Sequence, residues 1–292
     1  MMKRHDIIVW VLLVICTACE TEIDYKGEEL DNFMVLNANL RTDSVISCKI
    51  SRSNTIFENN YIQSLNDVEM SLYCNGERIG LGNSPVTGNY FWTEKVTEGN
   101  EYSIKVEHPK YESINAFTVI PEKANAWVSD INQKENGREE VTVTIDDKPG
   151  KNFYRLLLLR GNKKDYDDTF GYGAGYSDVY RFSSNDPVLN YNKVVNEESS
   201  FSDYPENIHG IFNDELFDGK RYNLKFTPWG ADDLVIDIQQ ISEDLYLYYR
   251  SIRYSDWYGE DPMVEPVRIH SNVNGGAGIL GSTNSNLIYK EE

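Results

Sequence analysis

Three aspartates in the middle of the chain are spaced closely enough to share a metal ion. They are Asp165, Asp167 and Asp168, and glycines follow at positions 171, 173 and 175. Carboxylate oxygens are the ligands that Ca²⁺ prefers, and glycines permit the tight turns of a binding loop. The EF-hand spacing is not met, because Thr169 and Phe170 stand where that loop has an acid and a glycine. Two interpretations stay open: a calcium site and a solvated acidic loop.

The same polar stretch carries aromatic side chains that could contact a ligand or a partner. The residues that we expect to do so are Tyr166, Tyr172, Tyr176 and Tyr180. Tyrosine offers a large rigid face and a hydroxyl, and such side chains are common on surfaces that recognise sugars or proteins. The alternative is that these rings pack the loop onto the body of the protein.

Other patterns that carry chemistry are incomplete. Residues 276–281 spell the glycine fingerprint of dinucleotide-binding proteins, but only 11 residues follow it, too few for the required helix and strand. We interpret the glycines as a backbone crossing without room for side chains. His108, His209 and His270 show no zinc-binding spacing, and the chain has no Gly-x-Ser-x-Gly motif. We therefore predict no catalytic residue and no cofactor, although carboxylates of a glycosidase could come from separate strands.

Cys19 is the residue with the most specific expected covalent chemistry. Lys3 and Arg4 precede nine apolar residues at 7–15, and Thr17 and Ala18 stand directly before Cys19. This order is typical of a secretory signal peptide that ends in a bacterial lipobox. Nine residues cover about 14 Å as helix at ~1.5 Å each, against about 30 Å of hydrocarbon, so a spanning helix is not expected. We predict a signal peptide over 1–18 and lipidation of Cys19; ordinary secretion is the alternative.

Charge and cysteine content narrow the class of protein. The formal net charge of -19 argues against nucleic acid as a partner and against electrostatic adhesion to anionic lipid. With 40% hydrophobic residues, the 292-residue chain is long enough for two domains. Cys48 and Cys74 lie on the apolar side of alternating segments, and both a disulfide and two buried thiols are compatible with that pattern.

The elements around these residues predict a mainly β protein. Residues 19–31 are polar and acidic, as in a flexible tether. Residues 32–123 contain short alternating strands, including a hairpin at Asn75-Gly76, and predict an immunoglobulin-like β-sandwich. A boundary is expected near Pro121.

Residues 124–292 predict a second β-rich sandwich domain. It contains a long polar loop at 161–206 and one helix at 242–254. Ser242 can cap that helix, and we expect its apolar stripe to pack across a sheet edge.

Three motifs in the last third resemble the outer-membrane lipoproteins of Bacteroidetes catalogued as domain of unknown function 4249. They are Phe212-Asn213-Asp214, Ser242-Glu243-Asp244-Leu245-Tyr246, and the segment from Glu265 to Gly281. Near the front, Val35-Leu36-Asn37-Ala38 and residues 99–104 agree with the same family. The resemblance implies a lipoprotein that often accompanies a TonB-dependent transporter, and it implies no reaction.

We therefore expect a non-catalytic binding or accessory component associated with a TonB-dependent transporter and anchored in the outer membrane through its N-terminal lipid. The alternative is a surface-tethered hydrolase that acts on glycans or peptides. Glu20, Glu22 and Asp24 follow the lipid site and resemble an export signal for the cell surface, although Thr21 and Ile23 interrupt the acidic run. Surface-exposed and periplasm-facing attachment both stay open.

Overall fold

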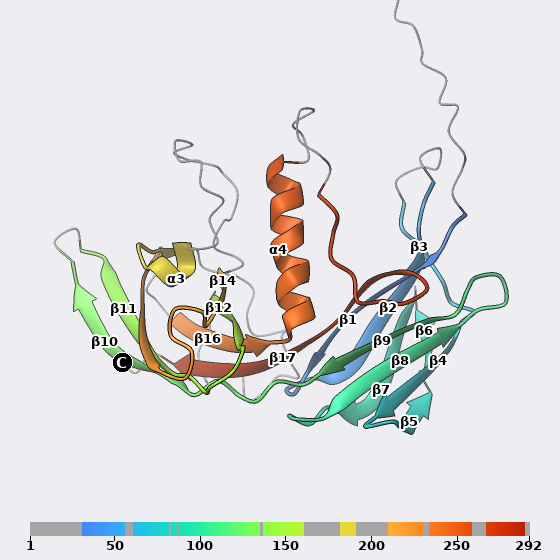
Figure 1. The fold of residues 1–292 in the computed structure, drawn as a ribbon, viewed down its shortest axis with the longest axis horizontal. Coiled ribbons are helices and arrows are strands. Elements are labelled where there is room, and N and C mark those ends of the chain that lie inside the picture. Colours follow the sequence, from blue (N-terminus) through green and yellow to red (C-terminus); the bar gives the residue numbers. More distant parts are fainter. Residues whose placement is uncertain are drawn as a thin grey trace, which may run out of the picture. The chain divides into compact units, whose positions relative to one another are not determined.

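A computed structural model describes residues 31–55, 61–81, 83–86, 88–134, 137–160, 182–190, 210–229, 234–258 and 267–289. Residues from Asn32 onward form one compact unit. The described chain is mainly β, as the sequence predicted, and Figure 1 shows its strands with one long helix, α4 (Glu243–Tyr258). The second helix is the single turn α3 (Pro187–Asn190). Neither of these described helices has the length and apolar character needed to cross a membrane.

One nine-stranded sheet contains strands from both ends of the chain. Its order is β14-β12-β16-β17-β1-β2-β7-β6, and the short β3 also pairs with β2. The C-terminal strands are β12 (Phe153–Arg160), β14 (Gly210–Asn213), β16 (Leu234–Ile241) and β17 (Ala277–Tyr289). The N-terminal strands are β1 (Met34–Arg41), β2 (Val45–Arg52), β3 (Gln63–Ser64), β6 (Asn83–Val86) and β7 (Asn89–Lys95). The parallel pair β1–β17 joins the two groups.

Two four-stranded sheets complete the sandwiches. The first has the order β5-β4-β8-β9, and the second has the order β10-β11-β15-β13. Their strands are β4 (Glu69–Cys74), β5 (Glu77–Leu81), β8 (Glu101–Glu107), β9 (Ile114–Val119), β10 (Ala126–Gln133), β11 (Glu139–Asp146), β13 (Phe182–Ser183) and β15 (Arg221–Pro228).

Both smaller sheets pack on the same face of the large one. Leu280 of β17 belongs to the first hydrophobic core, and Ile288 of the same strand packs against the second. Because side chains alternate along a strand, these two even-numbered residues point to one face. The first core is built from residues up to Ile120, with Val273 and Leu280, and the second begins at Ala124. The expected boundary near Pro121 thus separates two cores while one sheet runs through both; the division into domains stays a prediction.

Several local predictions are confirmed. Asn75 and Gly76 have φ values of 49° and 83°, as a type I′ turn requires, and they join β4 to β5. For the two cysteines the sequence left a disulfide and buried thiols open; in the structure both are free thiols, with Cys48 buried and Cys74 half-buried. The continuous apolar run of β12 is explained by burial on both faces, since Leu156 lies in the second core and Leu157 packs with Val235 on the opposite face.

The helix is confirmed, but its position and its end differ from the prediction. The backbone N–H of Leu245 donates to Ser242 Oγ at 3.4 Å, so Ser242 caps a helix that continues to Tyr258 instead of ending at 254. A Cβ on Gly281 would lie 2.7 Å from Leu245 Cδ1, which places the first turn of α4 directly over β17. Packing across a sheet edge is therefore wrong: β17 is a central strand, and α4 covers the face opposite the two smaller sheets.

The expected loop at 161–206 is interrupted by ordered structure. β13 and α3 lie within it, and their side chains Phe182 and Val188 are only 1% and 3% exposed in the second core. Phe182 falls inside the range that the sequence predicts as a polar loop. Its burial shows that the middle of this segment belongs to the sandwich.

Candidate functional site

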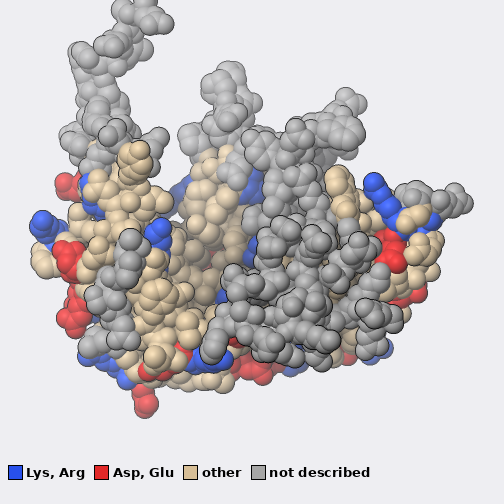
Figure 2. Space-filling view, turned by 180° about the vertical axis from the view of Figure 1, so that it is seen from behind, with Lys and Arg blue, Asp and Glu red and all other residues tan. Residues whose placement is uncertain are grey.

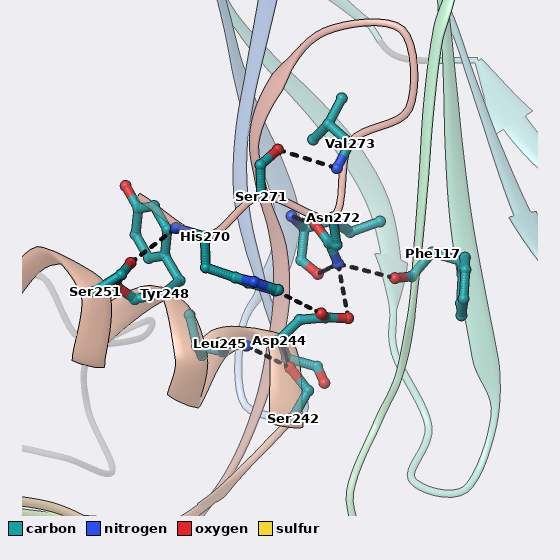
Figure 3. A network of polar contacts seen from close by, with 12 residues as sticks. Phe117, Ser242, Asp244, Leu245, Tyr248, Ser251, His270, Ser271, Asn272 and Val273 are labelled. Atoms are coloured by element: carbon teal, nitrogen blue, oxygen red, sulfur yellow. Dashed lines mark hydrogen bonds and ion pairs between the residues drawn. The ribbon is translucent and has the colours of Figure 1, made fainter. Parts of the chain in front are cut away.

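The second and third family-like motifs meet at the start of α4. Residues 267–276 form a strap that runs beside the helix and leads into β17 (Figure 3). The side chains that hold it are those of Ser242, Asp244, Ser251, His270 and Asn272, which we call the His270 network. Asp244 is placed by the first turn of α4, where the positive end of the helix dipole favours a carboxylate.

His270 and Asp244 form a half-buried imidazole–carboxylate pair. His270 Nε2 lies 2.8 Å from Asp244 Oδ1, and their side chains are 29% and 34% exposed. The backbone N–H of His270 also donates to Ser251 Oγ at 2.9 Å, and Ser251 Oγ donates to the carbonyl of Tyr248. An imidazole held by a carboxylate is the orienting half of a catalytic triad. In this site it fixes the strap against two turns of α4.

Asn272 makes the most contacts in the network. Its Nδ2 lies 3.0 Å from the carbonyl oxygen of Leu280 and 3.2 Å from Asp244 Oδ2. A third acceptor, the carbonyl oxygen of Phe117 in β9, is also at 3.2 Å, and Asn272 Oδ1 accepts from the Leu280 N–H at 2.9 Å. One side chain thus connects the helix, the large sheet and the first small sheet (Figure 3).

The serine hydroxyls near the pair are engaged with the backbone. Ser242 Oγ accepts from the N–H groups of Leu245 and Ser282, and Ser251 Oγ is held as described above. A triad needs a hydroxyl within hydrogen-bond reach of the free imidazole nitrogen. Within the described ranges, no hydroxyl hydrogen bond to His270 Nδ1 is formed. The hydrogen bonds of the His270 network instead connect segments that are distant in sequence.

Side chains of β17 also form hydrogen bonds with the segment that links the two small sheets. Three polar side chains alternate on its core face, and each donates to a backbone carbonyl of that segment. Ser282 Oγ lies 2.7 Å from the Val119 oxygen, Asn284 Nδ2 lies 3.0 Å from the Pro121 oxygen, and Asn286 Nδ2 lies 2.8 Å from the Ala126 oxygen. Ser282 is fully buried, and Asn284 is 4% exposed. These hydrogen bonds satisfy carbonyls that cross from one sheet to the other.

The glycines of the fingerprint-like segment allow this close packing, as the sequence predicted. A Cβ on Gly278 would stand 1.9 Å from the carbonyl oxygen of Leu36, and its φ of +111° is rarely adopted by other residues. A Cβ on Gly276 would stand 2.4 Å from the carbonyl oxygen of Met34. Both contacts are with β1, so the glycines permit the parallel β1–β17 pairing.

A separate acidic cluster ties two turns of the second sandwich together. Oxygens of Asp147, Asp214 and Asp218 lie within 4.8 Å of one another. Each carboxylate accepts from a backbone N–H: Gly219 donates to Asp147 at 2.8 Å, Asn152 to Asp214 at 2.9 Å, and Gly150 to Asp218 at 2.9 Å. Burial raises the pKa of Asp147 and of Asp214 above the usual carboxyl range. These oxygens could ligate a cation, but their hydrogen bonds already account for their positions.

Most residues that the sequence singled out lie outside the described residues. They are Cys19, the calcium candidates Asp165, Asp167 and Asp168, the tyrosines Tyr166, Tyr172, Tyr176 and Tyr180, and His209. His108 is described in the first sandwich, where its side chain is 3% exposed and its Nε2 lies 3.2 Å from Asp67 Oδ1.

Sequence reasoning missed the structural use of the asparagines and serines of β17. The available signal was the order Leu280, Ser282, Asn284, Asn286, Ile288, in which polar residues occupy alternate positions that a sandwich strand normally gives to apolar ones.

Residues 20–286 match the family model described as "Domain of unknown function (DUF4249)". This range contains the His270 network, both cores and the polar side chains of β17. A search of the curated proteins finds no match.

Proposed function

The chain belongs to the DUF4249 family, and from this premise we propose that it is a lipid-anchored accessory protein of the bacterial outer membrane. It binds a ligand or partner for a TonB-dependent transporter and catalyses no reaction. Its anchor is Cys19, because a basic pair, an apolar run and two small residues precede that cysteine in the order of a lipoprotein signal.

The observation that carries the accessory role is the use of the family-like motifs. The polar side-chain atoms of Asp244, His270 and Asn272 form hydrogen bonds with one another and with the backbone. Serine and asparagine side chains of β17 form hydrogen bonds with the segment between the two small sheets. These hydrogen bonds connect the large sheet to α4 and to the segment between the two small sheets. A rigid β framework is the usual support for loops that recognise a partner.

We place the contact surface in the segment 161–206, with Tyr166, Tyr172, Tyr176 and Tyr180 as anchors. These tyrosines lie outside the described residues, and we choose them because a tyrosine in a polar segment offers a large rigid face and a hydroxyl to a partner. The described middle of the segment supports it, because buried Phe182 and Val188 attach the segment to the second core at two points.

Affinity purification from detergent-solubilised outer membranes tests the association. The tagged wild-type chain is expected to retain a TonB-dependent transporter, and deletion of residues 163–180 is expected to release it while the urea midpoint stays unchanged. The alternative function is a surface-tethered hydrolase. Turnover of purified glycans or peptides that disappears when a single acid is replaced would establish that alternative and contradict the accessory role.

A further inference from the structure

A small cavity lies on the face of the large sheet that carries α4, at the start of β1 and the end of β2. Its volume is about 290 Å³, and it is lined by Val35, Asn37, Lys49, Ser51, Arg52, Asn54 and Ile62. Pockets for small organic ligands range from about 300 to 1,000 Å³. This cavity is therefore of a size that accepts one sugar ring or a group of similar volume, and not a folded partner.

The charge of the cavity is opposite to that of the chain. The chain has 47 acidic and 28 basic residues, yet the lining residues that the structure describes include Lys49 and Arg52 and no acid. Figure 2 shows the surface hollowed beside α4, with blue atoms of Lys and Arg along the walls of the hollow. In a protein of this composition, the ammonium of Lys49 in the described lining creates a local positive potential that attracts anions.

The two basic side chains of the cavity, Arg52 and Lys49, differ in their hydrogen-bond partners. Arg52 Nε donates to Gln63 Oε1 at 3.0 Å, and Arg52 Nη1 donates to the carbonyl of Ser53 at 3.2 Å. Lys49 is half-buried, and its ammonium has no hydrogen-bond acceptor and no carboxylate partner among the residues that the structure describes. A half-buried ammonium loses part of its hydration without compensation, so an anionic ligand would gain more from Lys49 than from an exposed lysine.

Asn37 stands next to Lys49. The two residues are direct partners in the β1–β2 register, which puts their Cβ atoms about 4.5–5.5 Å apart on one face. The amide of Asn37 also makes no side-chain hydrogen bond within the described ranges. Together the pair offers an ammonium and an amide N–H₂ to a carboxylate, and the amide oxygen to a neighbouring hydroxyl.

We propose that this cavity binds the carboxylate of an acidic monosaccharide unit, such as a uronic acid. Lys49 and Asn37 hold the carboxylate, Ser51 and Asn54 face the ring hydroxyls, and Val35 and Ile62 contact the C–H groups of the ring. This site goes beyond the proposed accessory role, because it uses none of the residues 161–206 and does not depend on a transporter.

Isothermal titration calorimetry of the full lipoprotein in detergent tests this assignment, with D-galacturonic acid, D-galactose and an acidic dipeptide as probes. Galacturonic acid is expected to bind saturably, with an affinity that falls as salt is raised. Galactose, which lacks the carboxylate, is expected to bind at least tenfold more weakly. The dipeptide, which lacks the sugar ring, is also expected to bind at least tenfold more weakly than galacturonic acid.

Lys49→Gln is expected to weaken the binding of galacturonic acid at least tenfold, and Asn37→Asp to abolish it by placing a second anion in the cavity. Lys105→Gln is the matched control, because Lys105 is an exposed lysine paired with Glu107 on the first small sheet, and it should leave the affinity unchanged. Urea midpoints of all variants verify folding. Equal binding of galactose or of the dipeptide, no saturable binding of galacturonic acid, or wild-type affinity in Lys49→Gln would each overturn the assignment.

Discussion

Replacement of Asn272 by alanine should remove a large part of the free energy that fastens the strap to its three neighbouring elements. Three acceptors lie within 3.2 Å of Nδ2, but the amide has two hydrogens, so it donates at most two hydrogen bonds at a time. With the bond that Oδ1 accepts from Leu280, the loss is three bonds at about 1 kcal/mol each. Urea unfolding followed by tryptophan fluorescence at constant pH should therefore show a loss of about 3 kcal/mol.

Asn274 provides a matched control four residues from His270. Its Nδ2 makes one exposed hydrogen bond, to Asn115 Oδ1 at 3.2 Å, so Asn274→Ala should cost about 0.5 kcal/mol. The two variants remove the same atoms from the same strap. If their unfolding free energies agreed within about 0.5 kcal/mol, a common error of such extrapolations, the fastening role of Asn272 would be refuted.

Three further changes test other parts of the fold. Gly278→Ala should cost more than about 3 kcal/mol or prevent folding, since its Cβ would meet the Leu36 oxygen, whereas Gly76→Ala, at a positive φ in open space, should cost about 1 kcal/mol. Burial raises the pKa of Asp214 in the folded protein, and Asp147 and Asp218 are its charged neighbours. The protonated Asp214 therefore stabilises the fold at a pH below the carboxyl pKa of the unfolded chain. This contribution is lost as the pH rises through the pKa of Asp214 in the folded protein. Urea midpoints of wild type should thus fall relative to Asp214→Asn as the pH rises above about 4, the usual carboxyl pKa, and parallel curves would argue against this burial effect. Burial also raises the pKa of the Cys48 thiol, so a thiol reagent should modify Cys74 in the folded protein and Cys48 only after urea is added; equal rates would contradict the described packing.

Local patterns in the sequence predicted the strands well because alternation reports burial directly. Met34, Leu36 and Leu40 alternate and are all fully buried, and Asn75-Gly76 forms the turn that its φ preferences require. The capping residue Ser242 likewise marked the start of α4. Each of these signals depends on neighbours within a few residues.

Long-range pairing was not predictable in the same way. The parallel alignment of Val35 with Ala277 joins segments from opposite ends of the chain, and no local pattern encodes that partner. For the same reason the polar residues of β17 could not be assigned, because their acceptors at Val119 and Pro121 become neighbours only in the folded sheet. Phe182 was placed in a loop because polar residues surround it, whereas tertiary contacts bury it.

The central claim is that Cys19 carries the lipid that holds this protein at the outer membrane. Metabolic labelling of cells with a palmitate analogue, followed by purification of the tagged chain, tests that claim most directly. The wild-type chain should be labelled and should sediment with the outer membrane, while Cys19→Ala should be unlabelled. Equal labelling of the two chains would contradict the account.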